Sequence, residues 1–290
     1  MTSDPLIAVR CLERSLGEVP DRGRRIHDLY WPVLTFCLAR CEAAVRRPLV
    51  VGLQAPQGAG KTTLAAHVLG CLPDLGLRGV SVSIDDFYLP RDEQLRLAGA
   101  HPGNPYLEHR GYPGTHDVAL GERTIAALRT LGDAGAAPVR VPAYDKSAHG
   151  GRGDRRPESE WPVVTPPIDV VLVEGWMLGF TSVEESRLDD PHLLAPNRAL
   201  ADYARWHRRI DAWVVLRALD PGYVLRWRVE AEENMKQAGK PGLSRDAIED
   251  YVRRFLPAYR LYGGAPPGMA PDAVQTLWLG DRRQVVPPPG

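Results

Sequence analysis

A strand, a glycine-rich turn and a helix follow one another over residues 49–72, and this unit constrains the fold more than any other part of the 290-residue chain. The run Leu49–Leu53 is short and apolar, as a buried parallel strand requires, and apolar residues then recur at helical spacing. Between them lie Gly58, Gly60 and Lys61. Such a turn can direct its backbone amides, and the positive end of the next helix, at an anion. The unit therefore predicts a phosphate-binding loop.

The residue types in this loop indicate which groups of a nucleotide they would bind. Lys61 would neutralise oxygens of the β and γ phosphates, and the Thr62 hydroxyl would hold a magnesium ion. The usual pattern G-x-x-x-x-G-K-[ST] has glycine where this chain has Ala55, so the match is imperfect. The alternative is a glycine-rich turn with an incidental lysine. The expected nucleotide-binding residues are Gly58, Ala59, Gly60, Lys61, Thr62 and Thr63.

Two further strands are expected to end in acidic residues. In GVSVSIDDFYLP the strand ends at Asp85 and Asp86, and the apolar run IDVVLVEG ends at Glu174. The carboxyl ends of parallel strands share one edge of a sheet, so these acids would lie near the phosphate loop. Asp85 could accept the proton of an attacking hydroxyl or organise magnesium, and Glu174 would lie near the metal. The alternative for the Asp pair is a turn or a helix cap. The predicted metal ligands are Thr62, Asp85 and Glu174.

Two polar segments are candidates for binding a substrate. The first, HRGYPGTHD, could orient Arg110 and His116 toward a ligand, with Asp117 capping the next helix. The second, VRVPAYDKSAHGGRGDRR, begins as a strand and becomes a glycine-rich loop suited to a small anionic or hydroxylated molecule. Exposed positions in solvent are the plain alternative for Arg155 and Arg156. The predicted substrate-contacting residues are Asp86, Tyr88, Arg110, His116, Tyr144, Lys146 and Arg152.

A charged helix is expected over residues 223–236, another helix over 246–259, and a last strand at VQTLWLG. Arg226 and Arg228 could close over the phosphates as a lid and act in catalysis. They lie about 200° apart on a helix, so one helical face cannot present both, and which of them faces the phosphates stays open. The competing interpretation pairs Arg226 with Glu230 on the helix surface.

Composition excludes several classes of protein. Lysine plus arginine equals aspartate plus glutamate at 36 each, so no basic field favours nucleic acid. No stretch is long and apolar enough to span a bilayer, and no signal segment opens the sequence, so we expect a cytoplasmic protein without a membrane partner. The four cysteines form no C-x-x-C pair, and Cys37 and Cys41 would share a buried helical face.

We expect one α/β kinase domain over residues 48–290, with substrate loops and a helical lid, and a helical N-terminal extension, residues 1–47, packed on it. The fold class is a P-loop NTPase-type, mostly parallel sheet flanked by helices in three α/β/α layers. The sequence makes no prediction of oligomeric state.

The segments APQGAGKTT, SIDDFYLP, GYPGTHD, VPAYDKSAHGGRGDR and VVLVEGWMLGF together resemble the D-glycerate 3-kinase family, within the P-loop kinases that include phosphoribulokinase, uridine kinase and pantothenate kinase. The resemblance extends from Pro48 to about Tyr262, and the Ala55 departure is similar in that family. It implies transfer of the γ phosphate of ATP, with Mg²⁺, to a hydroxyl of D-glycerate to give 3-phosphoglycerate. It also implies that Lys61, Asp85, Glu174 and Arg226 or Arg228 carry the catalysis.

Two alternatives stay open at this stage. The first is a kinase of the same fold that acts on another small acceptor such as pantothenate, a nucleoside or a sugar acid. The substrate loop has few aromatic residues and several arginines, which favours a small acid. The second is a non-enzymatic, ATP-dependent switch protein, which would leave the loop of residues 142–156 without an acceptor.

Overall fold

A six-stranded sheet forms the centre of the computed structural model, which describes residues 5–237, 239, 245–264, 266 and 268–289. The strands lie in the order β10-β9-β8-β1-β7-β2. Five of them are parallel, and β10 pairs antiparallel to β9. Their bounds are β1 Leu49–Gln54, β2 Gly79–Ser83, β7 Val170–Gly175, β8 Ala212–Ala218, β9 Val274–Leu279 and β10 Val285–Val286. The mostly parallel sheet expected from the sequence is therefore confirmed.

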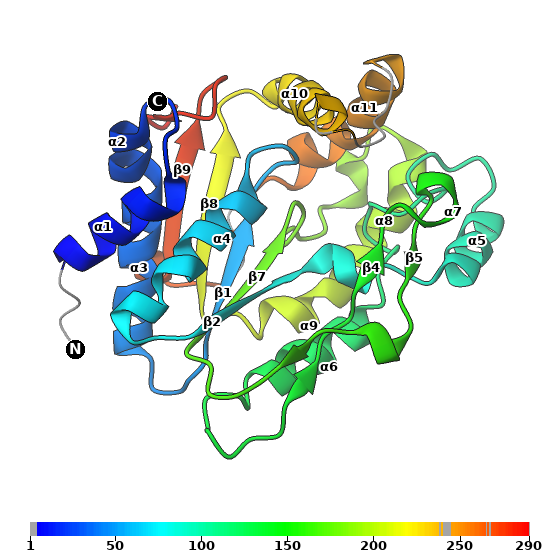
Figure 1. The fold of residues 1–290 in the computed structure, drawn as a ribbon. Coiled ribbons are helices and arrows are strands. Elements are labelled where there is room, and N and C mark those ends of the chain that lie inside the picture. Colours follow the sequence, from blue (N-terminus) through cyan, green and yellow to red (C-terminus); the bar gives the residue numbers. More distant parts are fainter. Residues whose placement is uncertain (1–4, 238, 240–244, 265, 267, 290) are drawn as a thin grey trace.

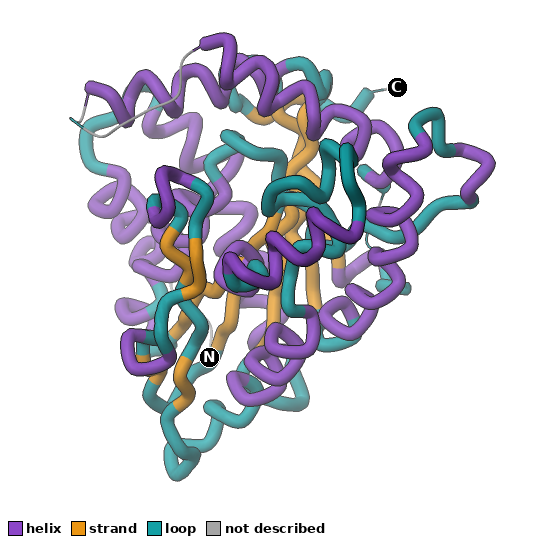
Figure 2. The backbone as a smooth tube through the Cα atoms, turned by 90° about the vertical axis from the view of Figure 1, so that its right-hand side faces the viewer, coloured by secondary structure: helices purple, strands orange, loops and turns teal. Residues whose placement is uncertain are grey.

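Helices cover both faces of this sheet (Figures 1 and 2). Every residue of β1 and of β7 is buried, as their continuous apolar sequences predict. One core cluster joins Leu53 to Leu64 and Val68 of α4 (Lys61–Cys71), and a second cluster on the other face joins Val50 to α6 (Val118–Leu128) and α11 (Arg245–Tyr262). The molecule thus has the three-layer α/β/α arrangement.

The N-terminal residues from Pro5 onward are helical, as expected for the described part of this segment. They form α1 (Pro5–Leu16), α2 (Arg22–Arg25), a π-helical turn Ile26–Tyr30 and α3 (Trp31–Ala43). Leu12 of α1 and Leu34 of α3 are fully buried in the cluster that contains α4. Cys37 and Cys41 are also buried there, as small apolar residues, which agrees with the sequence expectation.

Short helices and strands make up most of the connections between the strands of the main sheet. They are α5 (Arg91–Ala100), β3 (Val139–Arg140), β4 (Tyr144–Asp145), α7 (Ala148–Gly151), β5 (Asp154–Arg155), β6 (Val163–Val164), α8 (Leu194–Ala199) and α9 (Ala204–His207). β4 pairs with β5, and β3 with β6, as two small antiparallel sheets. They project the glycine-rich substrate loop beyond the end of β2 (Figure 1).

The charged helix α10 (Tyr223–Gln237) and the helix α11 lie over the carboxyl ends of the strands (Figure 1). The sequence expectation for both helices is confirmed within a few residues, and α11 continues through Pro257 to Tyr262. Among the described residues, no helix has both the length and the apolar character needed to cross a membrane.

Candidate active site

The predicted phosphate loop connects β1 to α4 in a left-handed turn. Gly58 has φ 75° and Gly60 has φ 89°, a backbone region that glycine adopts without strain. A Cβ atom at Gly58 would also lie only 2.8 Å from the Cβ of Trp227 in α10, so a side chain there would collide with that helix. The methyl group of Ala55 is fully buried beside the end of β7, and the fold accommodates the departure from the usual pattern.

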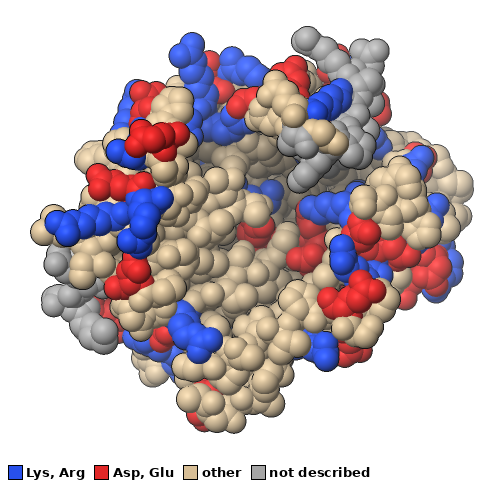
Figure 3. Space-filling model, in the orientation of Figure 1, with Lys and Arg blue, Asp and Glu red and all other residues tan. Residues whose placement is uncertain are grey.

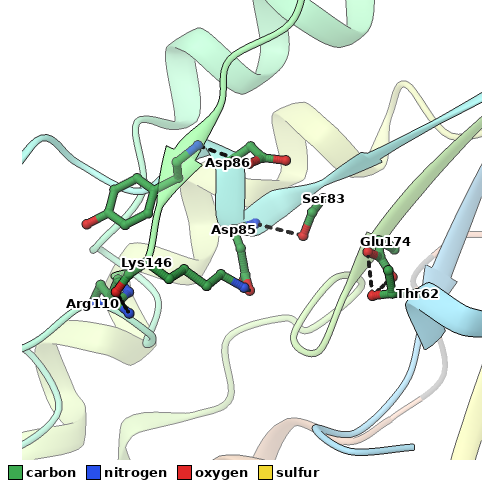
Figure 4. A network of polar contacts seen from close by, with 8 residues as sticks. Thr62, Ser83, Asp85, Asp86, Arg110, Lys146 and Glu174 are labelled. Carbon is green, nitrogen blue, oxygen red and sulfur yellow. Dashed lines mark hydrogen bonds and ion pairs between the residues drawn. The ribbon is translucent and has the colours of Figure 1, made fainter. Parts of the chain in front are cut away.

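Thr62 and Glu174 meet at the start of α4. The Thr62 hydroxyl donates to Glu174 Oε1 and Oε2 at 2.9 and 3.0 Å (Figure 4). Burial raises the pKa of Glu174, while the nearby Lys61 ammonium and the Thr62 hydroxyl lower it in part. A buried carboxylate in such a place is stabilised by a cation. Across the described residues no cluster of three or more His, Cys, Asp or Glu could hold a metal by itself. Two oxygen donors nevertheless fit Mg²⁺, which commonly keeps waters and phosphate oxygens as its other ligands.

Asp85 follows β2 in a short 3-10 turn, Ile84–Phe87, and forms an ion pair with Lys146 from the substrate loop. The Lys146 ammonium donates to Asp85 Oδ2 at 2.5 Å. Burial acts to raise the pKa of Asp85, but the Lys146 and Lys61 charges outweigh burial and lower the pKa to about 2. Asp85 is therefore a carboxylate at neutral pH and faces the same space as Thr62 and Glu174 (Figure 4).

Asp86 has a different environment from its neighbour. Its Oδ1 accepts a hydrogen bond of 3.2 Å from the backbone N–H of Tyr144, and this bond ties the start of β4 to the end of β2. Burial, together with the adjacent Asp85 charge, raises the pKa of Asp86 to about 6, although the hydrogen bond from the Tyr144 N–H lowers it in part. Two neighbouring carboxylates thus have pKa values on opposite sides of the ordinary value. The structure shows Asp86 holding the substrate loop in position.

Three aromatic rings form one wall of the site. The Tyr88 and His116 rings stack at 4.3 Å, and Tyr144 packs edge-on against Tyr88 at 5.5 Å. His116 Nδ1 lies 2.7 Å from the Tyr203 hydroxyl, and its Nε2 has no hydrogen-bond partner in the described part of the chain. Burial lowers the pKa of His116 to about 3, so this ring is neutral at physiological pH. Tyr88, His116 and Tyr144 are all buried.

The two other predicted substrate residues are Arg110, which contacts the substrate loop, and Arg152, which lies within it. The Arg110 guanidinium donates to the carbonyl oxygens of Lys146, Gly151 and Arg152 and lies over the Tyr144 ring. Arg152 contacts the His109 ring. Arg110 therefore holds in place the backbone of the loop that carries Lys146, whose ammonium pairs with Asp85. Figure 3 shows this face hollowed below α10, with acidic and basic side chains in the hollow.

The solvent-exposed interpretation of Arg155 is wrong. Its side chain is 13% exposed, and its guanidinium contacts Asp117 at 3.3 Å and donates to the Tyr88 carbonyl at 2.8 Å. A third contact goes to the Phe87 carbonyl. Asp117 also caps α6 by accepting from the Leu120 N–H, as the sequence suggested. Sequence reasoning missed Arg155 because its partners lie 38 to 68 residues away. Arg156, which is half-exposed beside Glu160, does lie at the surface.

The arginines of α10 are both engaged with carboxylates. Arg226 pairs with Asp281 at 2.8 Å, and Arg228 pairs with Glu232 one turn along the helix. The competing interpretation, a surface pair between Arg226 and Glu230, is wrong, because Arg226 pairs with Asp281 and Glu230 pairs with Arg283 at 2.7 Å. The lid role of Arg226 and Arg228 stays a prediction.

Arg283, in the turn between β9 and β10, contacts the phosphate loop directly. Its Nε donates to the Gly58 carbonyl at 2.7 Å, and its NH2 group contacts the Trp227 carbonyl. This residue, near the C-terminal end of the sequence, joins α10 to the loop. Its position 225 residues from Gly58 gave the sequence analysis no local signal.

The comparisons with known proteins agree with this geometry. A scan against models of protein families finds no match. The chain is 40% identical over 284 residues to the chloroplastic D-glycerate 3-kinase of Arabidopsis thaliana, covering 92% of this chain and 62% of that protein. It is 37% identical over 230 residues to an uncharacterized kinase of Schizosaccharomyces pombe, covering 75% of this chain and 82% of the relative. The structure of D-glycerate 3-kinase from Cryptococcus neoformans superposes with a TM-score of 0.80 at 31% identity, over 89% of this chain and 98% of that one.

A parallel sheet that carries a phosphate loop after β1, with Glu174 at the end of the neighbouring strand β7 and Asp85 after β2, one strand further out, defines a P-loop kinase. The similarity to the relatives reported above identifies one family within the P-loop kinases. The chain belongs to the D-glycerate 3-kinase family, and it spans 62% of the length of the plant relative.

Proposed function

We propose that this protein transfers the γ-phosphoryl group of ATP to a hydroxyl of D-glycerate, giving 3-phosphoglycerate and ADP. The observation that carries the proposal is the juxtaposition of a hydrogen-bonded pair and an ion pair at one edge of the sheet (Figure 4). Thr62 and Glu174 lie beside the phosphate loop, and Asp85 and Lys146 face them from β2 and the substrate loop. The first pair suits a nucleotide with Mg²⁺, and the second suits a small hydroxy acid. Action on a small molecule in the cytoplasm, without a nucleic-acid or membrane partner, is part of the proposal.

The phosphate side would bind ATP through the loop amides of residues 58–63 and the Lys61 ammonium. Among the described residues, Lys61 has no hydrogen bond or ion pair with the protein, so its charge is available to the β and γ phosphates. Thr62 and Glu174 would hold Mg²⁺, which supplies neutralisation of phosphate oxygens when it is bound. Catalysis in this class is mostly positioning and charge stabilisation.

On the acceptor side, Asp85 would orient the substrate hydroxyl and accept its proton. The hydroxyl oxygen forms a bond to the γ phosphorus, the bond from that phosphorus to the bridging oxygen breaks, and ADP leaves. In the structure Asp85 is held by Lys146, so an entering glycerate must share that ion pair. The glycerate carboxylate would take Lys146 as its partner, which frees an Asp85 oxygen for the hydroxyl. Arg152, at the rim of the loop, is a further candidate partner for the carboxylate.

The substrate wall supports a small acceptor. Tyr88, Tyr144 and His116 pack on one another, so their ring faces are occupied and do not form an open slot for a nucleobase. Arg226 and Arg228 would act as the lid by exchanging Asp281 and Glu232 for phosphate oxygens when the nucleotide binds.

The test is ADP release from ATP and Mg²⁺ by the purified chain, with D-glycerate, L-glycerate, pantothenate, uridine and ribulose 5-phosphate as acceptors. We expect stimulation by D-glycerate. The ³¹P spectrum of the product would then distinguish a primary phosphate ester, coupled to two protons, from a secondary one. Stimulation by another acceptor would refute the choice of glycerate, and ATP binding without any stimulated turnover would favour the switch protein.

A further inference from the structure

A cavity of about 320 Å³ lies at the carboxyl ends of β1, β8 and β9. Four aromatic side chains contribute to its walls, Trp176, Phe180, Tyr259 and Trp278. Gln54 and Pro56 line it from the end of β1 and the start of the phosphate loop, and Arg217 lines it from β8. The volume is within the range of small-molecule sites, and mostly apolar walls with a few polar groups are typical of them.

Part of the cavity wall lies on the face of the sheet opposite to the face that α4 covers. Side chains alternate along a strand, so Gln54 shares a face with Val50, which packs in the cluster that includes Trp176 and Phe180. The α4 residues Leu64 and Val68 belong to the cluster on the opposite face. Leu216 and Val224, which also line the cavity, belong to that α4-side cluster. The lining residue Tyr259 accepts a hydrogen bond from the Gln57 N–H of the phosphate loop. The cavity therefore adjoins the phosphate loop, and its Trp176 and Phe180 wall belongs to the cluster on the face opposite α4.

Arg217 gives this cavity a positive charge. Within the described residues, its guanidinium makes no ion pair or hydrogen bond. It stacks over the Trp278 ring at 5.4 Å, on the strand that pairs with its own. Burial lowers the pKa of the Arg217 guanidinium, and no carboxylate of the described chain offsets the loss of water. A half-buried arginine in this situation is stabilised by an anion, preferably one with a planar, bidentate head.

Two other residues of the wall carry polar groups without partners. Gln54 Nε2 and Trp176 Nε1 are buried, and so is Arg217 Nε, and none has a hydrogen-bond acceptor among the residues that the structure describes. Buried donors in folded proteins nearly always have an acceptor, so three unmatched donors around one cavity need an explanation. A ligand with oxygen acceptors could accept hydrogen bonds from these donors, once small side-chain rotations turn them toward the cavity.

We propose that this cavity is a second ligand site, which binds a small aromatic carboxylate. The carboxylate takes Arg217 as its partner and accepts from Gln54 or Trp176. The aromatic body of the ligand lies between Trp176 and Trp278, where stacking and loss of water from apolar surface favour it. The site adjoins the phosphate loop, and ligand binding there does not require ATP or glycerate to be bound.

The experiment uses the whole chain and 2-naphthoate as the probe, with binding followed by titration calorimetry and by quenching of tryptophan fluorescence. We expect saturable binding of one molecule per chain. Arg217→Gln should weaken this binding at least about tenfold, because a charge-assisted contact is lost, and Arg217→Lys should keep part of it. The neutral analogue 2-naphthamide should bind at least about tenfold more weakly than the acid.

Two controls separate this site from the active site. Arg123→Gln, at an exposed arginine on α6, should bind 2-naphthoate like the unmodified chain. Saturating ATP with Mg²⁺ should leave 2-naphthoate bound, and Lys61→Ala should retain the site even if phosphoryl transfer is abolished. The proposal is wrong if 2-naphthoate does not saturate a site, if Arg217→Gln or the amide binds equally well, or if ATP displaces the probe completely. Complete displacement would make the cavity part of the nucleotide site.

Discussion

Replacing Asp86 with asparagine should remove a pH-dependent cost to stability. The Asp86 carboxyl is partly buried in the turn after β2, and burial raises its pKa to about 6 from 3.8. An asparagine has nearly the same shape, and its amide oxygen can still accept the Tyr144 N–H that Asp86 Oδ1 accepts now. Asp86→Asn therefore removes the ionisation while it keeps the hydrogen bond that positions the substrate loop.

The size of the effect follows from the two pKa values. Because the pKa in the folded state is above the pKa in the unfolded state, ionisation of Asp86 opposes folding. This cost is absent below about pH 4 and complete above about pH 6. Each unit of difference between the pKa of Asp86 in the folded state and its pKa in the unfolded state corresponds to about 1.36 kcal/mol. The full cost of ionising Asp86 in the folded state is therefore about 3 kcal/mol. The asparagine variant should therefore gain about 3 kcal/mol of stability relative to the unmodified chain as pH rises from 4 to 7.

The assay is equilibrium unfolding by urea at half-unit steps between pH 4 and pH 8, without ligands. Other groups titrate in this range, including the buried His116 and His207, whose lowered pKa values cost stability as the pH falls. Their contributions cancel in the difference between variant and unmodified chain. Asp189→Asn, at an exposed carboxylate, is the matched control and should give a difference that does not change with pH.

A difference between Asp86→Asn and the unmodified chain that stays constant within about 0.5 kcal/mol from pH 4 to pH 8 would refute the reasoning. It would mean that Asp86 is solvated enough to ionise at its ordinary pKa. A difference of the opposite sign would mean that a cation stabilises the carboxylate.

Three further variants test the active site. Asp85→Asn should lower kcat by about 10²-fold or more and leave ATP affinity near normal, because the group acts on the acceptor hydroxyl; unchanged kcat in an ADP-release assay would assign the base elsewhere. Lys61→Ala should weaken both ATP binding and turnover, since the charge contacts phosphates in the ground state and in the transition state, and a fully active variant contradicts the phosphate-loop assignment. Arg110→Lys should raise KM for D-glycerate by about 10-fold to 100-fold, because a lysine cannot bond all three loop carbonyls that Arg110 bonds, whereas KM for ATP should not change. Equal rises in both KM values would mean that the clamp supports the whole domain rather than the acceptor loop.

The parts of this protein that are encoded in contiguous segments could be predicted from the sequence. The phosphate loop was predictable because its glycines, its lysine and its flanking strand and helix occupy some 24 consecutive residues whose patterns follow from backbone geometry. The buried strand that ends at Glu174 was predictable for the same reason. A continuous apolar run has few folded environments open to it, and the centre of a parallel sheet is one of them.

The sequence predicted which residues belong to the candidate acceptor site, but it did not predict which partner each of them contacts. Lys146 and Arg110 were both expected near a substrate, but only the folded chain shows that Lys146 pairs with Asp85 and that Arg110 clamps the backbone of its loop. Asp85 and Asp86 are adjacent and chemically identical in the sequence. Burial raises the pKa of both, but the Lys146 and Lys61 ammonium groups outweigh burial at Asp85, whereas at Asp86 the Tyr144 N–H offsets burial only in part.

The sequence by itself determined the class of fold, the nucleotide-facing loop and the family, because these depend on local periodicity, on turn chemistry and on motifs. The tertiary structure decided what each charged side chain faces. Arg155 is mostly buried and pairs with Asp117, and Arg283 donates to the Gly58 carbonyl of the phosphate loop. Arg217 has no carboxylate partner in the described chain. Such pairings join residues up to 225 positions apart, and their strength depends on burial and on distance, which no short stretch of sequence encodes.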